Sequence, residues 1–317
     1  MGALDVIGFG WRFPDFPTDG SSFSDFTQQI RENLDVLVSY NYDSAWVADH
    51  FIPWPDWQEE DTPTIECLTT ISYYSALYPQ IKWGSTVFCQ SYRNPAALAK
   101  AFAQLCALNP GKYIFGIGAG WKEKEYIEYN FPFPKPSVRI TQMAEAIQIA
   151  KLLWTQSNAT FEGKHYRIHE ATVNPKPDPL PPIMVGGAGE KLTMRVAAQY
   201  ADWWNLSGGS IETFRHKLEV LRRHCEDVGR SYDSIVKSWS SSCVAVADSS
   251  SQAERIARSS PFYSEDSAIF GTPDEVARQV EARISSGVQH FQLRFADFPS
   301  TRSMELFGRE VIPRFLS

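Results

Sequence analysis

The chain has 317 residues, of which 43% are hydrophobic, and a formal net charge of −7 at pH 7. This apolar share is ordinary for a globular protein and large enough for a substantial core. An acidic balance without blocks of like charge argues against nucleic acid as a partner. The sequence holds no run near the ~20 apolar residues of a membrane span, and it begins without the basic and apolar regions of a secretory signal. We therefore expect a cytoplasmic protein that does not bind membranes.

The cysteines and histidines form no metal-binding or disulfide pattern. The five cysteines are odd in number, widely spaced and without a CxxC pair: Cys67, Cys89, Cys106, Cys225 and Cys243. The histidines show neither H-x-x-H nor HExxH spacing, the patterns typical of zinc sites on helices. We expect neither a disulfide framework nor a metal site.

The first half of the chain alternates buried strand patterns with helical periodicity. Strands are predicted at residues 4–10, 44–48 and 81–88 and in the apolar run that begins at Lys112. A helical stripe lies within residues 23–37, and Asn94-Pro95 predicts a second helix with Asn as N-cap and Pro in the first turn. Residues 51–63 and 121–138 are expected to be loops.

The second half continues the alternation. Residues 140–154 predict a long helix, and the insertion at residues 160–182 holds two short β-like pieces. Four more strands are predicted: at residues 183–185, 202–206, within 236–247, and at 288–295. Helical stripes follow the first two of them, and a capping box at Thr272–Glu275 predicts the start of the last helix.

Eight strand–helix units in this order require parallel strands, because each helical crossover returns the chain to the same end of the sheet. We therefore predict an α/β fold, with residues 1–317 forming a single TIM (β/α)8 barrel domain. Barrels of this kind commonly reach ~250 residues and more as one unit. The insertions should lie after strands at the C-terminal face, where barrels carry their function.

Two of the predicted strands end in glycine turns. The turns comprise Gly118, Ala119 and Gly120 in one case, and Gly186, Gly187, Ala188 and Gly189 in the other. Such turns expose backbone N–H groups to a phosphate or a flat ring, although ordinary turn geometry explains most glycines after strands. Neither turn fits the G-x-G-x-x-G pattern of a Rossmann fold. Together they indicate a cofactor cradle on one rim of the barrel.

His50 directly follows a predicted strand and Asp49, on the rim where barrel chemistry occurs. A neutral imidazole can donate a proton or contact a ring carbonyl at physiological pH. The alternative is a histidine that is bonded locally to Asp49. We take His50 and Asp49 as the candidate catalytic residues. Trp121, next to the first glycine turn, is either a wall of the cofactor pocket or a lid over the barrel mouth.

Six short motifs run in order along the chain: Trp46–Phe51, Tyr92–Ala96, Phe115–Trp121, Phe161–Tyr166, Pro182–Gly187 and Ala201–Asn205. Together they resemble the signature of the bacterial luciferase-like superfamily, over about residues 4 to 295. Within it the chain is most similar to the branch of coenzyme F420-dependent oxidoreductases. The resemblance also implies a homodimer and a small-molecule substrate.

The resemblance further implies roles for single residues. It places a non-prolyl cis peptide at about Thr86-Val87, behind the central ring of the cofactor, and a phosphate on the backbone amides of the two glycine turns. It matches His50 with the histidine that faces the reactive edge of the ring. Trp121 stands where some sugar-phosphate dehydrogenases of this class carry a glutamate, so the resemblance does not extend to that arrangement.

Three hypotheses for function follow from these residues. The first is an enzyme that moves a hydride between the deazaflavin coenzyme F420 and a small organic substrate. The second is an FMN-dependent monooxygenase that receives reduced flavin from a partner reductase. The third is a non-catalytic flavin-binding barrel, against which the Asp49-His50 pair argues because such a protein needs no proton donor at the ring.

Overall fold

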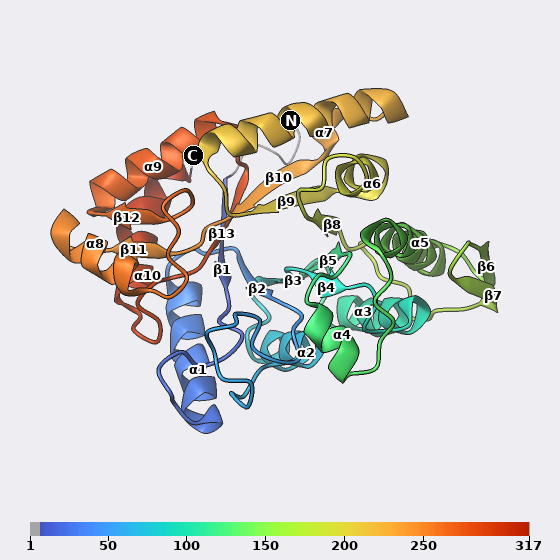
Figure 1. The fold of residues 1–317 in the computed structure, drawn as a ribbon, viewed down its shortest axis with the longest axis horizontal. Coiled ribbons are helices and arrows are strands. Elements are labelled where there is room, and N and C mark those ends of the chain that lie inside the picture. The colour runs from blue at the N-terminus through green and yellow to red at the C-terminus, as the bar shows by residue number, and fades with distance from the viewer. Residues whose placement is uncertain (1–6, 317) are drawn as a thin grey trace. The chain divides into compact units, whose positions relative to one another are not determined.

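The computed structural model describes residues 7–316. Its main sheet has nine strands in the order β3-β2-β1-β13-β10-β9-β8-β5-β4, and a further pairing of β3 with β5 closes it. Eight strands thus form a parallel ring, with helices between them in the chain, and β4 lies outside the ring. Figure 1 labels these strands and helices. This arrangement confirms the predicted TIM-barrel fold. The recorded pairings of the ring are parallel, for example Phe9 with Phe291 and Phe115 with Ile183.

Each predicted ring strand is present. The ring strands are β1 (Gly8–Arg12), β2 (Ser44–Val47), β3 (Lys82–Ser85), β5 (Tyr113–Gly118), β8 (Ile183–Gly186), β9 (Trp203–Ser207), β10 (Val236–Ser240) and β13 (His290–Leu293). The first strand was expected at residues 4–10, of which 4–6 lie outside the described residues. The expected strand at 81–88 divides into β3 and the short β4 (Phe88–Cys89).

By its contacts the chain divides into two compact units. The first unit comprises the described residues of Met1–Trp46, Asn205–Val220 and Val236–Ser317. The second unit comprises Val47–Trp204 and Leu221–Ile235. The expectation that residues 1–317 form one domain remains a prediction.

The first unit packs helices and a small sheet around an aromatic core. Phe9 on β1 stacks on Phe291 of β13, with ring centroids 5.3 Å apart, and its other neighbour is Phe307 at 5.6 Å. All three rings are buried. The other elements of this unit are α1 (Phe23–Ser39), β11 (Val244–Val246), α8 (Ser250–Ser259), β12 (Ile269–Gly271), α9 (Pro273–Ser285) and α10 (Arg302–Leu306). The predicted capping box begins α9, with Thr272 and Glu275 bonded reciprocally.

The second unit has its core where α3 (Pro95–Leu108) and α5 (Pro136–Thr155) cover β5. Phe115 of β5 lies 5.0 Å from Phe102 and 5.3 Å from Trp154, measured between ring centroids. Asn94 caps α3 through the amides of residues 96 and 97, as predicted. The remaining elements are α2 (Cys67–Leu77), α4 (Glu123–Glu128), the hairpin β6 (Ala159–Glu162) and β7 (Arg167–Ala171), and α6 (Thr193–Tyr200).

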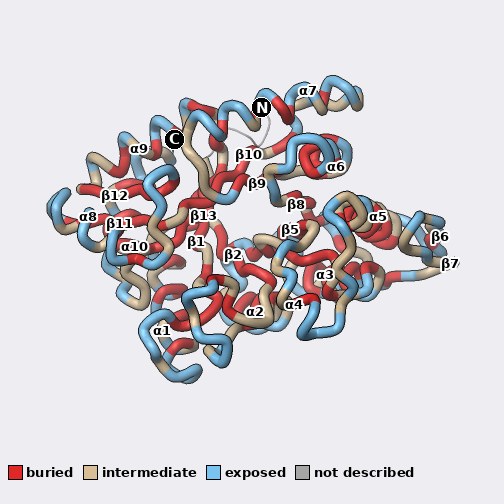
Figure 2. Tube along the Cα trace, in the orientation of Figure 1, coloured by how far each residue is buried: buried red, intermediate tan, exposed pale blue. Residues whose placement is uncertain are grey.

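Figure 2 shows how burial follows these layers. The ring strands are largely buried, whereas the β6–β7 hairpin, which matches the two predicted β-like pieces, is mostly half-buried or exposed. The helix α7 (Ile211–Val228), which contributes to both units, matches the predicted stripe. Within residues 7–316 no helix is both long and apolar enough to cross a bilayer.

Besides α8, β12 and α10, where the sequence analysis named no element, the patterns missed α2, α4 and β11. The helix α2 is rich in β-branched and aromatic residues, which are weak helix formers, and its N-terminus is fixed by Glu66. The helix α4 lies in the segment expected to be a loop and has six residues, too few for a periodic stripe. The region expected to hold one strand within 236–247 holds both β10 and β11, and only β10 joins the ring.

The close approach of β3 and β5 gives a stability prediction. A Cβ at Gly116 would lie 1.9 Å from the backbone oxygen of Ser85. Since backbone cannot move aside cheaply, we expect Gly116→Ala to lower the free energy of unfolding by about 3 kcal/mol. Gly229→Ala is the control: its φ is +68° with nothing within 4 Å, so it should cost about 1 kcal/mol. Urea unfolding followed by circular dichroism measures both, and equal losses would contradict the prediction.

Candidate active site

In the second unit, a buried carboxylate forms a hydrogen bond with His50. The Nδ1 atom of His50 lies 3.0 Å from Oε2 of Glu125, which belongs to α4. The same carboxylate accepts a hydrogen bond of 2.7 Å from the Tyr92 hydroxyl and bonds from the amides of Phe51 and Ile52, at 2.6 and 3.3 Å. The side chain of Glu125 is wholly buried. Four donors therefore converge on one carboxylate directly behind His50.

These contacts set the charge of Glu125 and the tautomer of His50. Burial alone would raise the pKa of Glu125, but the hydrogen bond and charge of His50, together with the Tyr92 and backbone donors, hold it below its ordinary value. An ionised carboxylate can only accept, so the hydrogen in its bond with His50 belongs to Nδ1. In neutral His50 this leaves Nε2 as the acceptor nitrogen.

Asp49 has different partners. Its carboxylate forms a two-pronged ion pair with Arg93, at 2.7 and 2.8 Å, and accepts a bond of 2.9 Å from the amide of Cys89. Arg93 also contacts Glu66 at the start of α2. Burial raises the pKa of Asp49, and Arg93 partly offsets that effect. The recorded partner of His50 is therefore Glu125, rather than Asp49 as in the local-bonding alternative. A catalytic role for Asp49 remains a prediction.

Two tryptophans lie beside the imidazole. The ring centroid of His50 is 5.7 Å from that of Trp121 and 6.4 Å from that of Trp54. The two tryptophan rings are 6.4 Å apart and nearly perpendicular, with an interplanar angle of 71°. Trp121 is 58% exposed, which is unusual for so large an apolar side chain. The exposed indole beside His50 is a surface against which a flat ligand can pack.

Val87 packs against the start of both glycine turns. The peptide bond between Thr86 and Val87 is cis, as the resemblance implied. A Cβ at Gly118 would lie 2.5 Å from one methyl group of Val87, and a Cβ at Gly186 would lie 2.8 Å from the other. The structure thus brings together residues from the ends of β3, β5 and β8 that were predicted to form the cofactor site.

The two turns present unused backbone donors. Among the residues that the structure describes, the amides of residues 119–121 and 187–189 donate no recorded hydrogen bond. Gly120 and Gly187 have φ angles of +76° and +128°, which other residues rarely adopt. At Gly120 a side chain would also collide with the Tyr126 hydroxyl, 1.9 Å from the Cβ position. The turns that contain Ala119 and Ala188 are therefore shaped to expose backbone rather than side chains.

Sequence reasoning missed Glu125 and the ion pair of Arg93. Glu125 lies in the segment expected to be an inserted loop, and its partners His50 and Tyr92 are 75 and 33 residues away in the chain. The stretch after Trp121 mixes aromatic and charged residues and holds three glutamates, at positions 123, 125 and 128, so no local signal singles out Glu125. Within the described residues, no group of three or more His, Cys, Asp or Glu side chains could hold a metal. The five cysteines are buried, and none of them forms a disulfide within the described residues.

Comparison with known proteins places this geometry in a family. Residues 39–266 match the family model described as luciferase-like monooxygenase. The F420-dependent glucose-6-phosphate dehydrogenase of Kineococcus radiotolerans is 26% identical over 319 residues, which cover 92% of this chain and 91% of the relative.

Two solved structures share the fold. An F420-dependent secondary alcohol dehydrogenase in complex with an F420-acetone adduct matches with a TM-score of 0.82 and 20% identity, over 98% of this chain and 100% of its own. The FMN-bound oxygenating constituent of 3,6-diketocamphane monooxygenase, from the CAM plasmid of Pseudomonas putida, matches with a TM-score of 0.79 and 18% identity. That match covers 98% of this chain and 99% of the monooxygenase. With its family-model match over most of its length, the chain belongs to the luciferase-like monooxygenase family.

Proposed function

We propose that the protein is an oxidoreductase that transfers a hydride between coenzyme F420 and a small organic substrate. The observation that carries the proposal is His50, fixed by the buried Glu125 and flanked by Trp54 and Trp121. The names of the F420-dependent curated relatives favour this cofactor over FMN. When bound, a deazaflavin supplies a two-electron hydride carrier, because carbon replaces the N5 atom of flavin.

The second unit has the features that such a cofactor needs. Val87 would lie behind the ring, since Gly118 and Gly186 leave space only for its two methyl groups. The backbone amides of residues 119–121 and 187–189 would hold the phosphate, as exposed amides do in other anion sites. Trp121 would form a wall of the ring pocket.

We propose that His50 transfers the proton and that Glu125 orients the imidazole of His50. With Nδ1 bonded to Glu125, Nε2 is the atom that exchanges a proton with the substrate oxygen. The negative charge of Glu125 stabilises the imidazolium that forms when Nε2 takes up a proton. Tyr92 and the amides of residues 51 and 52 keep that charge satisfied while it is buried. In this scheme Asp49 supports the site by anchoring Arg93 and the end of β4.

The alternatives remain an FMN-dependent monooxygenase supplied by a partner reductase and a non-catalytic flavin-binding barrel. The buried Glu125 argues against the non-catalytic flavin-binding barrel, because cofactor binding alone does not require a charged group that orients an imidazole. Oxidation of a sugar phosphate would need an acid in place of the missing glutamate at position 121. The homodimer also remains a proposal from the resemblance: Tyr73, Leu77 and Leu108 of α2 and α3 are exposed, whereas Ala99 and Ala103 are buried within the chain.

Titration with the two cofactors tests the proposal. We expect F420 to bind at least tenfold more tightly than FMN, a difference of about 1.4 kcal/mol. We also expect no oxygen uptake above background when reduced F420 is added. Tighter binding of FMN, with oxygen uptake on addition of reduced FMN, would contradict the proposal and favour the monooxygenase. Binding of either cofactor without turnover across a panel of alcohols and aldehydes would favour the non-catalytic barrel.

Replacement of His50 separates chemistry from binding. His50→Ala should slow turnover by about 10²–10⁴-fold, the usual contribution of a general acid or base. The affinity for F420 should stay within about tenfold, because one lost hydrogen bond is worth about 0.5–1.5 kcal/mol. Cofactor absorbance follows turnover, and fluorescence quenching gives the affinity. His169→Ala, on the exposed hairpin strand β7, is the control and should change neither. Undiminished turnover in folded His50→Ala protein would remove the proton-transfer role.

A further inference from the structure

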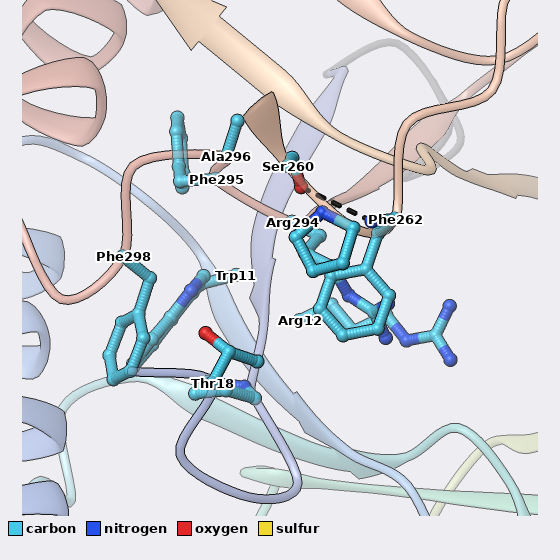
Figure 3. Close-up of a pocket in the computed structure, with 11 residues that line it drawn as sticks. Trp11, Arg12, Thr18, Ser260, Phe262, Arg294, Phe295, Ala296 and Phe298 are labelled. Carbon is cyan, nitrogen blue, oxygen red and sulfur yellow. Dashed lines mark hydrogen bonds between the residues drawn. The ribbon is translucent and has the colours of Figure 1, made fainter. Parts of the chain in front are cut away.

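A pocket in the first unit joins two arginines to aromatic side chains. Arg12 ends β1, and Arg294 directly follows β13, the strand that pairs with β1. Both therefore stand at the carboxyl ends of neighbouring parallel strands, the end at which α/β barrels bind ligands. The pocket is lined by these arginines together with Trp11, Pro14, Thr18, Ser260, Pro261, Phe262, Phe295, Ala296 and Phe298 (Figure 3). We call it the arginine pocket.

The two guanidinium groups have different surroundings. The Cζ atom of Arg294 lies 4.0 Å from the ring centroid of Phe262, in a cation–π contact. The Phe262 amide in turn bonds to Ser260, which fixes the loop that carries the ring (dashed line in Figure 3). Arg12 is half-buried, and its Nη1 makes a long contact of 3.4 Å with Ser207. Its buried Nε has no hydrogen-bond partner within the described part of the chain.

The pocket carries an excess of positive charge. Burial, followed by the neighbouring charge of Arg12, lowers the pKa of Arg294 to about 9, and burial lowers the pKa of Arg12 as well. Asp15 is the carboxylate that acts on both arginines. Burial raises the pKa of the neighbouring Cys243 thiol to about 11, so it is neutral at pH 7. The residues that line the pocket include these two arginines and no Asp or Glu, so a bound anion would meet two guanidinium groups.

We propose that the arginine pocket binds a small organic carboxylate. The planar guanidinium groups of Arg12 and Arg294 match the two oxygens of a carboxylate. Trp11, Phe262 and Phe298 offer an apolar surface for the hydrocarbon part of the ligand. The aromatic lining favours a carboxylate with a hydrocarbon part over inorganic phosphate, which has none. All the residues that line the pocket belong to the first unit, whereas His50 and Glu125 belong to the second.

Calorimetry on the full chain without cofactor tests the site. The probe is benzoate, with benzamide as its uncharged counterpart and inorganic phosphate as the competing anion. We expect benzoate to bind with a dissociation constant below about 1 mM and both other probes to bind at least tenfold more weakly. Equal binding of benzoate and benzamide would overturn the proposal, and so would tighter binding of phosphate.

Variants locate the binding. Arg12→Gln and Arg294→Gln should each weaken benzoate binding at least tenfold. Arg12 is only half-buried, so its variant carries the test if Arg294→Gln does not fold. Arg302→Gln is the matched control: this exposed arginine of the same unit pairs with Asp248 and lies outside the pocket, so affinity should not change. Undiminished benzoate affinity in folded Arg12→Gln protein would show that the two arginines serve only to neutralise Asp15.

Discussion

The candidate active site depends on the buried carboxylate of Glu125. A buried charge is costly unless it is fully hydrogen-bonded, and here an imidazole, a phenol and two backbone amides supply the donors. Those donors come from the segments that follow β2 and β4. Glu125, a residue of the short helix α4, therefore links three segments of the chain: the two that supply the donors and its own. The same bonds dictate which nitrogen of His50 carries hydrogen. The chemistry proposed for His50 therefore follows from the electrostatic needs of its neighbour.

The ring strands and the helix α9 could be predicted because their signals are local: apolar runs, glycine turns and the capping box at Thr272. His50 could be predicted from its place after β2. The partners of His50 and Asp49 could not, because Glu125 and Arg93 are 75 and 44 residues distant and only the fold brings them close. Hydrophobic periodicity carries no information about such pairings. The helix α4, with six residues, is also too short to show a periodic pattern.

The glycines illustrate how one residue type can serve two purposes. Sequence reasoning interpreted the glycine turns as donors of backbone hydrogen bonds. The structure adds a steric reason for Gly118 and Gly186, which border the methyl groups of Val87. Gly120 and Gly187 instead have backbone angles that favour glycine. The first pair shapes the floor of the proposed ring site, and the second pair directs the amides, so the two explanations are complementary.

The tautomer of His50 tests the role of Glu125 most directly. Nitrogen-15 labelling of the six histidines, with proton–nitrogen correlation spectra recorded at mildly alkaline pH, distinguishes the two neutral tautomers. The signal absent from folded His50→Ala protein identifies the residue. We predict that neutral His50 carries its hydrogen on Nδ1, in the bond to Glu125. Hydrogen on Nε2 would contradict the account, because Nδ1 would then be an acceptor facing a carboxylate and Nε2 could not accept a proton.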